Sequence, residues 1–370
     1  MAAVYKSACE ACGSREIVAV SEGYTSGASE LHLNGHRTIE LLHDRLVDLD
    51  LAPLAVALED GNPFSTVNLS YNKIGAGGAQ SLQKLLEKDS KIEALDLSEN
   101  DLDATAVQAL CSGLKVNTSV KELKLSGNKM GGAGGMAVAE LAQSNNMLQR
   151  LALANCGLDT ASLVALATVL RDNKGLTSLD ISRPLQPSMV MDEATSHFAR
   201  ALAVNTTLVE LHLAKSGIRD HGLQLLVEEL YFAGPASQLQ VLGLQGNQIR
   251  LSDAESVSAL GRLLSSEGCR VNTLLLGSNG LKDEGALKLA EVVETSRNLR
   301  KLDVGFNGIS SRGLCALARS VSSHPTLEEA MLWGNRFDSA ACLAWIPSLD
   351  FLKLDLAVQE VDGAFNAVQC

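Results

Sequence analysis

Apolar residues recur along the chain in a short motif, Leu-x-Leu-x-x-Asn, at nearly constant spacing. Three neighbouring copies read Val67-Asn-Leu-Ser-Tyr-Asn72, Leu95-Asp-Leu-Ser-Glu-Asn100 and Leu123-Lys-Leu-Ser-Gly-Asn128. The alternation of apolar and polar residues predicts a short strand with two side chains directed to the core. Between copies, apolar residues at helical spacing, such as Leu163, Leu166 and Leu170, predict a helix. Each unit is therefore expected to be strand, loop and helix.

The motif occurs eleven times, and this repetition determines the expected fold. The copies end at positions 36, 72, 100, 128, 156, 184, 216, 247, 279, 307 and 335, so six of the ten steps are 28 residues. One unit cannot bury both of its faces alone, so the units must stack. We predict an α/β solenoid (horseshoe) of about eleven repeats, with a concave parallel sheet and convex helices. The repeats span 28–337, between a helical or loose N-terminal cap (1–27) and a C-terminal cap (338–370).

Particular positions within the repeat have predicted structural roles. The Asn side chain can hydrogen-bond backbone groups where the strand turns outward, and stacked copies would form a ladder. Cys156 can replace it weakly, whereas Pro184 and Ser216 cannot, and we expect a distorted solenoid around 183–198. A small residue six positions after the Asn, such as Gly78, would let the helix pack closely. The sequons at Asn117 and Asn205 are interpreted as turns between a helix and the next strand.

Composition and charge narrow the class of protein further. The 370 residues are 46% hydrophobic and 20% charged, and the net charge is −12. A negative chain does not favour binding to nucleic acid or to anionic membranes. No apolar run approaches the 18 residues of a membrane-spanning helix, and no signal peptide is recognisable. The eight cysteines are mostly far apart, which is typical of reduced thiols in an intracellular protein.

The unit Leu-x-x-Leu-x-Leu-x-x-Asn-x-Ile-x-x-x-Gly resembles the ribonuclease-inhibitor class of leucine-rich repeats over roughly residues 28–340. This resemblance implies a non-enzymatic leucine-rich-repeat interaction protein. Less repetitive segments resemble one subgroup of that class, whose members are associated with motile cilia, testis, the nucleolus and stem cells. The segments are Leu31-His-Leu-Asn-Gly, Asn155-Cys-Gly-Leu-Asp159, Ser182-Arg-Pro-Leu185, Trp333-Gly-Asn-Arg-Phe-Asp338 and Val361-Asp-Gly363.

The concave sheet is the expected binding surface, because stacked strands there present a broad exposed face. Its exposed positions are polar and of mixed charge in the first half, and apolar near the end. An apolar cluster of this kind either contacts a partner or lies under the C-terminal cap. In the first case Trp333 is the expected anchor. The candidate partner-binding residues are Asp96, Lys124, Asp180, Leu275, Phe306, Met331 and Trp333, and Gly243 and Asp303 are also expected to be exposed.

The residues give weak support to catalysis or metal binding. Cys9-Glu-Ala-Cys12, with His32 and His36, has a zinc-like order, but its gap is longer than a zinc finger's. Plain loop cysteines are favoured over zinc or a redox pair there, and Cys156 and Cys315 are expected in the core. There is no Gly-Lys dipeptide, no H-E-x-x-H and no G-x-S-x-G. We therefore expect no cofactor, no metal and no small-molecule substrate.

Three functions remain open from the sequence. The leading hypothesis is a protein-binding scaffold or adaptor, placed by the resemblance in motile cilia or flagella, at the axoneme or in the cytoplasm, with axonemal partners. The second is a nuclear or nucleolar adaptor linked to stem-cell or ribosome-biogenesis factors. The third is a GTPase-activating protein of the leucine-rich-repeat type, in which Arg150 and Arg183 could stabilise charge.

Overall fold

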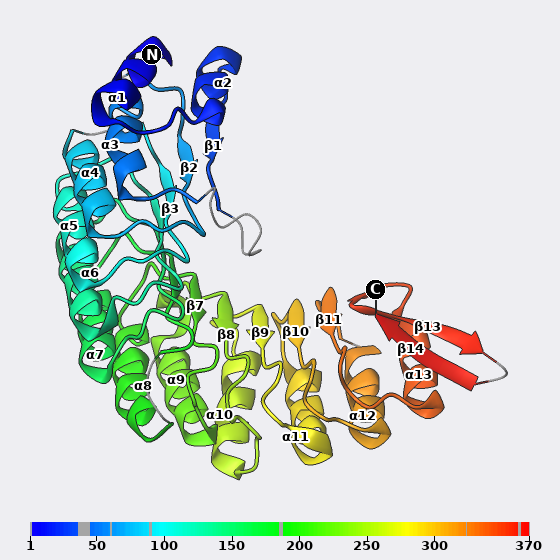
Figure 1. Cartoon of the computed structure of the whole chain (residues 1–370). Helices are drawn as coiled ribbons and strands as arrows, with labels where there is room; N and C mark the ends of the chain where they lie inside the picture. The colour runs from blue at the N-terminus through cyan, green and yellow to red at the C-terminus, as the bar shows by residue number, and fades with distance from the viewer. Residues whose placement is uncertain are drawn as a thin grey trace. The chain divides into compact units, whose positions relative to one another are not determined.

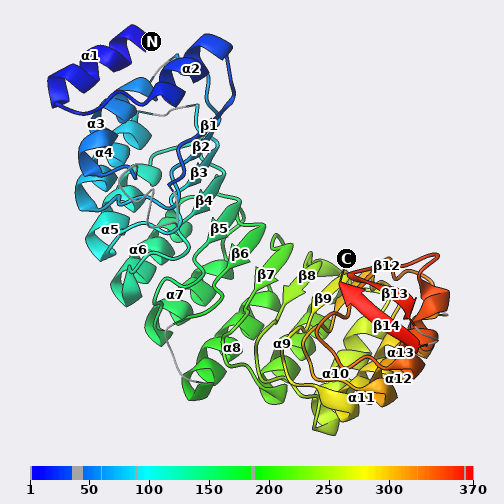
Figure 2. The ribbon, with the colours of Figure 1, turned by 45° about the vertical axis from the view of Figure 1, so that its right-hand side comes forward.

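The computed structural model describes residues 2–35, 45–59, 61–88, 91–184, 188–322, 324–361 and 364–369. The chain divides into two compact units, Met1–Gln186 and Pro187–Cys370. Within each unit, helices lie along one side of a row of short strands (Figures 1 and 2). The resembled segments that reach Leu185, Asp362 and Gly363 extend in part outside the described residues, and His36 lies outside them.

The described residues of the first unit contain six parallel strands in chain order. They are β1 (Glu30–His32), β2 (Thr66–Asn68), β3 (Ala94–Asp96), β4 (Glu122–Lys124), β5 (Arg150–Ala152) and β6 (Ser178–Asp180). Their central residues pair in register, from Leu31 with Val67 to Leu151 with Leu179. The helices are α1 (Ala2–Cys12), α2 (Val18–Ser26), α3 (Asp48–Ala57), α4 (Ala76–Glu87), α5 (Ala104–Leu114), α6 (Gly131–Ser144) and α7 (Thr160–Leu170). The N-terminal segment is thus helical, one of the two expected forms.

The second unit repeats this arrangement and extends it. Its parallel strands are β7 (Glu210–His212), β8 (Val241–Gly243), β9 (Thr273–Leu275), β10 (Lys301–Asp303), β11 (Glu329–Met331) and β12 (Lys353–Leu354). Its helices are α8 (Ser188–Leu202), α9 (Asp220–Ala233), α10 (Ala254–Ser265), α11 (Lys282–Thr295), α12 (Ser311–Ser322) and α13 (Ser339–Trp345), with short 3₁₀ turns at Gly234–Ala236 and Ile346–Ser348. An antiparallel hairpin, β13 (Leu356–Val361) and β14 (Ala364–Gln369), follows β12.

These elements confirm the predicted class of fold and add to it. The eleven strands β1–β11 lie at the eleven copies of the motif. Helix α13 ends before Pro347, as expected. The twelfth strand and the hairpin were not predicted. In the segment where distortion was expected, residues 188–198 belong to α8, and residues 185–187 lie outside the described residues.

The repeated Asn forms the predicted ladder in both units. In Asn100, Nδ2 donates to the carbonyls of Leu69 and Leu97 at 2.9 and 3.0 Å, and Oδ1 accepts from the Ile74 N–H at 3.0 Å. One side chain therefore joins two successive repeats, and its buried amide is satisfied. The Cys156 thiol makes a weaker version of this bond, donating to the Leu125 carbonyl at 3.2 Å. Equivalent bonds are made by Asn72, Asn128, Asn247, Asn279, Asn307 and Asn335.

A second ladder lies where helices α5, α6 and α7 give way to the next strand. The Asn117 side chain is 2% exposed; it donates to the Leu86 carbonyl at 3.0 Å and accepts from the Val120 N–H at 2.8 Å. Asn145 and Asn173 make the same two kinds of bond. The sequon asparagines Asn117 and Asn205 are therefore buried turn residues, as predicted, and their amides are already bonded inside the fold.

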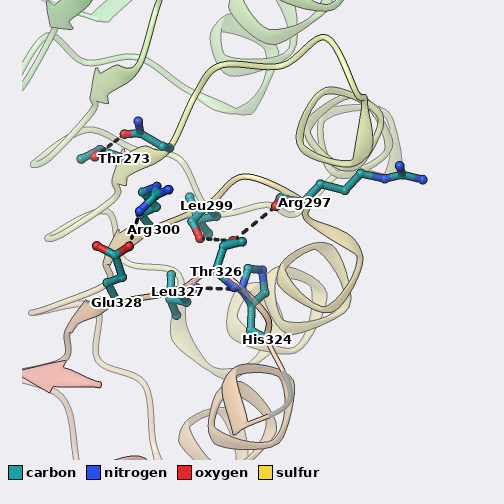
Figure 3. A network of polar contacts seen from close by, with 9 residues as sticks. Thr273, Arg297, Leu299, Arg300, His324, Thr326, Leu327 and Glu328 are labelled. Atoms are coloured by element: carbon teal, nitrogen blue, oxygen red, sulfur yellow. Dashed lines mark hydrogen bonds and ion pairs between the residues drawn. The ribbon is translucent and has the colours of Figure 1, made fainter. Parts of the chain in front are cut away.

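The second unit keeps Asn205 at the turn after α8 but builds the turn after α12 with a histidine. His324 Nδ1 accepts from the N–H groups of Thr326 and Leu327 at 3.3 and 3.1 Å, and Nε2 lies 2.7 Å from Ser296 Oγ (Figure 3 shows His324 with Thr326 and Leu327). Ser296 Oγ itself donates to the Val293 carbonyl. These bonds require a neutral ring protonated at Nε2. Burial also lowers the pKa of His324, which favours this neutral ring.

Close packing explains the small residue six positions after the Asn. A Cβ on Gly78 would lie 2.6 Å from Cγ2 of Ile74, and one on Gly313 would lie 2.5 Å from Cγ2 of Ile309. The small residue therefore makes room for the apolar side chain of the preceding loop. Of the two cysteines expected in the core, Cys156 is 1% exposed, as predicted. The prediction for Cys315 is wrong: it is only partly buried, because it lies on the flank of α12 toward Ala340.

Candidate interaction surface

The face of each sheet that helices leave uncovered, here called the open face, consists of the first and third residues of each strand. In the first unit it is polar and forms a pocket of about 160 Å³ between β1 and β4. The structure brings two predicted binding residues together there, Asp96 and Lys124. The pocket is also lined by His32, Asn68 and Glu122.

The charged residues of this open face are partly committed to bonds within the fold. Lys124 Nζ lies 2.8 Å from Glu122 Oε1, and both side chains are partly exposed. Asp96 and Asp180 each accept a hydrogen bond at 2.9 Å from the backbone N–H two residues further on. The aspartates therefore brace the loop that follows their strand, a role that the sequence analysis did not assign. Exposed ion pairs contribute little to stability, so Lys124 and Glu122 can exchange partners at low energetic cost.

The open face of the second unit mixes charged with apolar residues, and Lys301 Nζ lies 3.2 Å from Glu329 Oε1 there. Leu275 of β9 and Met331 of β11 are half-buried. Asp303 of β10, expected to be exposed, is only 8% exposed, because its carboxylate folds back to accept from the Gly305 N–H at 2.9 Å. Burial raises the pKa of Asp303, and the neighbouring Asp355 acts in the same direction. Gly243 is buried too, since His212 lies against it.

Phe306 is the most exposed of the predicted apolar residues, with 62% of its surface accessible. It has a left-handed backbone, with φ of 55°, which is unfavourable for a bulky residue. Its ring packs on Gly334, where a Cβ would lie 2.3 Å from Phe306 Cδ1. The neighbouring repeat thus leaves room for the ring and keeps it in water.

The left-handed position recurs immediately before the ladder position in the ten repeats from Tyr71 to Gly334. Glu99 lies over Gly127 in the same manner, and Lys215 over Gly246. The glycines at this position were a signal in the sequence that could have predicted the positive φ. Residues with positive φ here include Tyr71, Glu99, Asn155, Arg183, Lys215, Ser278 and Phe306.

Trp333 is half-buried, and the C-terminal segment holds its backbone. The carboxylate of Asp355 accepts from the N–H groups of Leu332 at 2.7 Å and Trp333 at 3.1 Å. The cap therefore reaches the backbone of the loop after β11 while Phe306 stays in solvent. Trp333 as a partner anchor stays a prediction, since contact with the cap and contact with a partner both fit a half-buried ring.

The residues considered for other chemistry lie apart from one another. Cys9 is buried and Cys12 is exposed, and burial raises the pKa of Cys9, which disfavours the thiolate. His32 Nε2 lies 3.0 Å from Glu30 Oε2. In the described part of the chain, no three potential metal ligands gather, and no helix is long and apolar enough to cross a membrane. Arg150 begins β5 and Arg183 has a positive φ; both are exposed.

An exposed aromatic pair away from the open face was not predicted. Phe232, at the end of α9, is 75% exposed, and its ring meets Tyr231 edge-on at 5.7 Å. The Arg262 guanidinium lies 5.9 Å from the Tyr231 ring and pairs with Glu228. Tyr231 and Phe232 are adjacent in a chain with only 4% aromatic residues, and this was the sequence signal that could have predicted the pair.

Comparison with known proteins agrees with the geometry. A family profile described as Leucine Rich repeat matches residues 63–82, 88–111, 116–139, 204–227, 271–290 and 295–318. The pig (Sus scrofa) ribonuclease inhibitor is 27% identical over 162 residues, which cover 37% of this chain and 35% of the inhibitor. A solved leucine-rich repeat-containing protein, LegL7 from Legionella pneumophila, aligns with a TM-score of 0.47 and 19% identity over 74% of this chain and 86% of that one. The profile and the inhibitor together show that the chain carries leucine-rich repeats and is similar to proteins of the ribonuclease-inhibitor-like class.

Within this class the chain resembles leucine-rich repeat-containing protein 34. The protein from Mus musculus is 32% identical over 172 residues, which cover 46% of this chain and 40% of the mouse protein. The one from Homo sapiens is 30% identical over 168 residues, 45% of this chain and 35% of the human protein. The chain thus spans about two-fifths or less of these relatives, so the similarity is to a part of each.

Proposed function

We propose that this protein is a non-enzymatic scaffold that holds a protein partner at the open face of its second unit and the adjoining loop around Phe306. The observation that carries the proposal is an exposed ring on a left-handed backbone, seated on a glycine of the next repeat. An aromatic residue held in water at such a position is costly for the isolated protein and suited to act as an anchor at an interface. Leu275, Met331 and Trp333 extend the apolar surface on neighbouring strands and loops.

The test compares two exposed phenylalanines. Phe306→Ala removes the proposed anchor, and Phe232→Ala removes a similarly exposed ring on the helical side of the same unit. Partners would be captured by crosslinking from ciliated cells, and binding of each recovered partner to the purified variants would then be measured. We expect Phe306→Ala to weaken binding at least about tenfold, as for an interface hot spot. Equal loss with both variants, or with neither, would contradict the proposal.

The finer placement rests on the resemblance to leucine-rich repeat-containing protein 34. We propose that the scaffold acts in motile cilia or flagella, at the axoneme, with axonemal proteins as partners. Imaging of the tagged protein in ciliated cells tests this placement. Signal along the axoneme is the expected result, whereas nucleolar signal would replace it with the adaptor role in the nucleus.

The remaining alternative is a GTPase-activating role through Arg150 or Arg183. Single-turnover GTP hydrolysis by candidate GTPases, with and without the protein, tests it directly. The scaffold proposal expects no acceleration, because a scaffold holds its partner without supplying a group to the reacting phosphates. A rate increase that Arg183→Ala or Arg150→Ala abolishes would contradict the non-enzymatic assignment.

A further inference from the structure

The C-terminal hairpin has two strand edges, and they differ in what they contact. Helix α13 packs against β14, and Ser339 Oγ donates to the Phe365 carbonyl at 3.4 Å. Strand carbonyls point within the plane of a sheet, so this bond places α13 along the outer edge of β14. In Figures 1 and 2 the hairpin lies beside α13 at the end of the second unit.

The outer edge of β13 has no such neighbour. Within the described residues, the backbone groups of Leu356–Val361 bond only across the hairpin, in register with Ala364–Gln369. Two-stranded hairpins are marginally stable in water, and unprotected edges invite further strands. The strand has no proline and only one charged residue, Glu360. It therefore lacks most of the features that usually prevent another strand from pairing with an exposed edge.

Apolar side chains around this end of the chain remain in solvent. Val361, at the end of β13, is 53% exposed, and Phe351, just before β12, is also 53% exposed. Leu343 on α13 and Leu349 are 50% and 39% exposed. The C-terminal cap therefore covers the last repeat but leaves its own apolar side chains exposed. Exposed apolar clusters of this kind are typical of a surface that binds another protein.

We propose that β13 pairs antiparallel with β13 of a second copy of this chain, forming a four-stranded sheet across a two-fold axis. Its sequence suits self-pairing: centred on Val358, the pairing sets Val358 opposite its own copy, Ala357 opposite Gln359 and Leu356 opposite Glu360, so no like charges meet. A strand from an unrelated protein would leave its own outer edge open. Two copies meeting about a two-fold axis close both β13 edges at once.

The experiment uses the full chain. Light scattering with size-exclusion chromatography from about 1 to 100 µM measures the dimer, and hydrogen exchange at both ends of that range reports the β13 amides. We expect a dimer whose formation slows exchange over residues 356–361. Gln359→Lys places two introduced ammonium groups near the axis and is expected to weaken the dimer about fivefold or more.

Asn366→Lys is the matched control, because Asn366 pairs with Gln359 across the hairpin and is equally exposed. It adds the same charge on the strand that α13 borders, and it is expected to leave the dimer intact. Thermal unfolding checks that both variants fold. A monomer at every concentration would overturn the proposal. So would a dimer without added β13 protection, or one that both variants weaken equally.

Discussion

The two units are built from one repeat and differ in what they place on it. Both carry the Asn ladder, and both centre each strand on a buried apolar residue. The first unit has a charged open face and Asn at the turns after α5, α6 and α7. The second mixes apolar and charged residues on its open face, keeps Asn205 at its first such turn, and has Ser296 and His324 at the last two. The residues shared by the two units thus determine the fold, and the residues that differ between them determine how the surfaces and turns differ in chemistry.

The largest expected effect tests whether the two cores are equivalent. Leu97 and Leu276 occupy the same strand-end position in the two units, and both are fully buried. Changing either to Ala leaves a cavity, so each variant should lose about 2–5 kcal/mol in free energy of unfolding. Urea denaturation of the two variants measures this. A cost well below that range in one unit alone would show that the cores differ as well as the surfaces.

A second prediction concerns the carboxylates that join helices to the next loop in the second unit. Asp220 Oδ1 accepts from the N–H groups of Arg250 and Leu251, and Oδ2 from Ser252. Burial alone would raise its pKa, but the hydrogen bonds outweigh burial and lower it. Asp220→Asn should cost about 1–3 kcal/mol at neutral pH, since an amide cannot accept at both atoms.

The pH dependence of Asp220 follows from the direction of that shift. A lowered pKa means that the unfolded chain binds the proton more readily, so the stabilisation is present above the ordinary value of 3.8 and is lost as pH falls through the lower, folded one. Unfolding of wild type and Asp220→Asn from pH 7 to pH 3 tests this. Parallel curves would rule out a contribution from this carboxylate.

The third prediction concerns the turn at His324, where a histidine accepts the two backbone hydrogen bonds. Burial lowers the pKa of His324, so the unfolded state takes up a proton first, as pH falls below 6.5. Its stabilisation is present above that pH and is lost on acidification, because a protonated Nδ1 would face two backbone donors. His324→Asn installs the residue found at the turns of Asn117, Asn145, Asn173 and Asn205, and it should remove this loss, as measured by hydrogen exchange of Thr326 and Leu327 between pH 7 and 5. Unchanged pH dependence in the variant would contradict the assignment.

The smallest expected effect concerns the backbone at Phe306. Glycine tolerates the left-handed conformation, so Phe306→Gly should raise the free energy of unfolding by up to about 1 kcal/mol. Thermal unfolding would measure it. If binding were lost at the same time, stability and function would be shown to conflict at this residue. A destabilised variant would instead mean that the ring on Gly334 is part of the core.

The sequence by itself determined the repeat. Its Leu-x-Leu period located β1–β11, because alternation is the direct consequence of a strand with one buried face. The Asn ladder also followed, since a buried amide must find partners and the stacked turns are the only nearby ones. The alternation in Leu352-Lys-Leu-Asp-Leu356 is the same kind of signal for β12. It was not recognised as a repeat because it does not follow the 28-residue spacing and lacks the Asn.

The tertiary structure alone decided which predicted surface residues remain in water. Asp303 and Phe306 lie three residues apart in one repeat, yet the carboxylate is buried against backbone and the ring is exposed. Their exposure depends on neighbouring repeats, on Gly277 and Gly334, and on the Asp355 that the cap delivers beside Trp333. The spacing of apolar residues predicts which face of the sheet a residue occupies. Whether that face is covered depends on side chains distant in sequence that pack against it, and a local sequence pattern does not specify that packing.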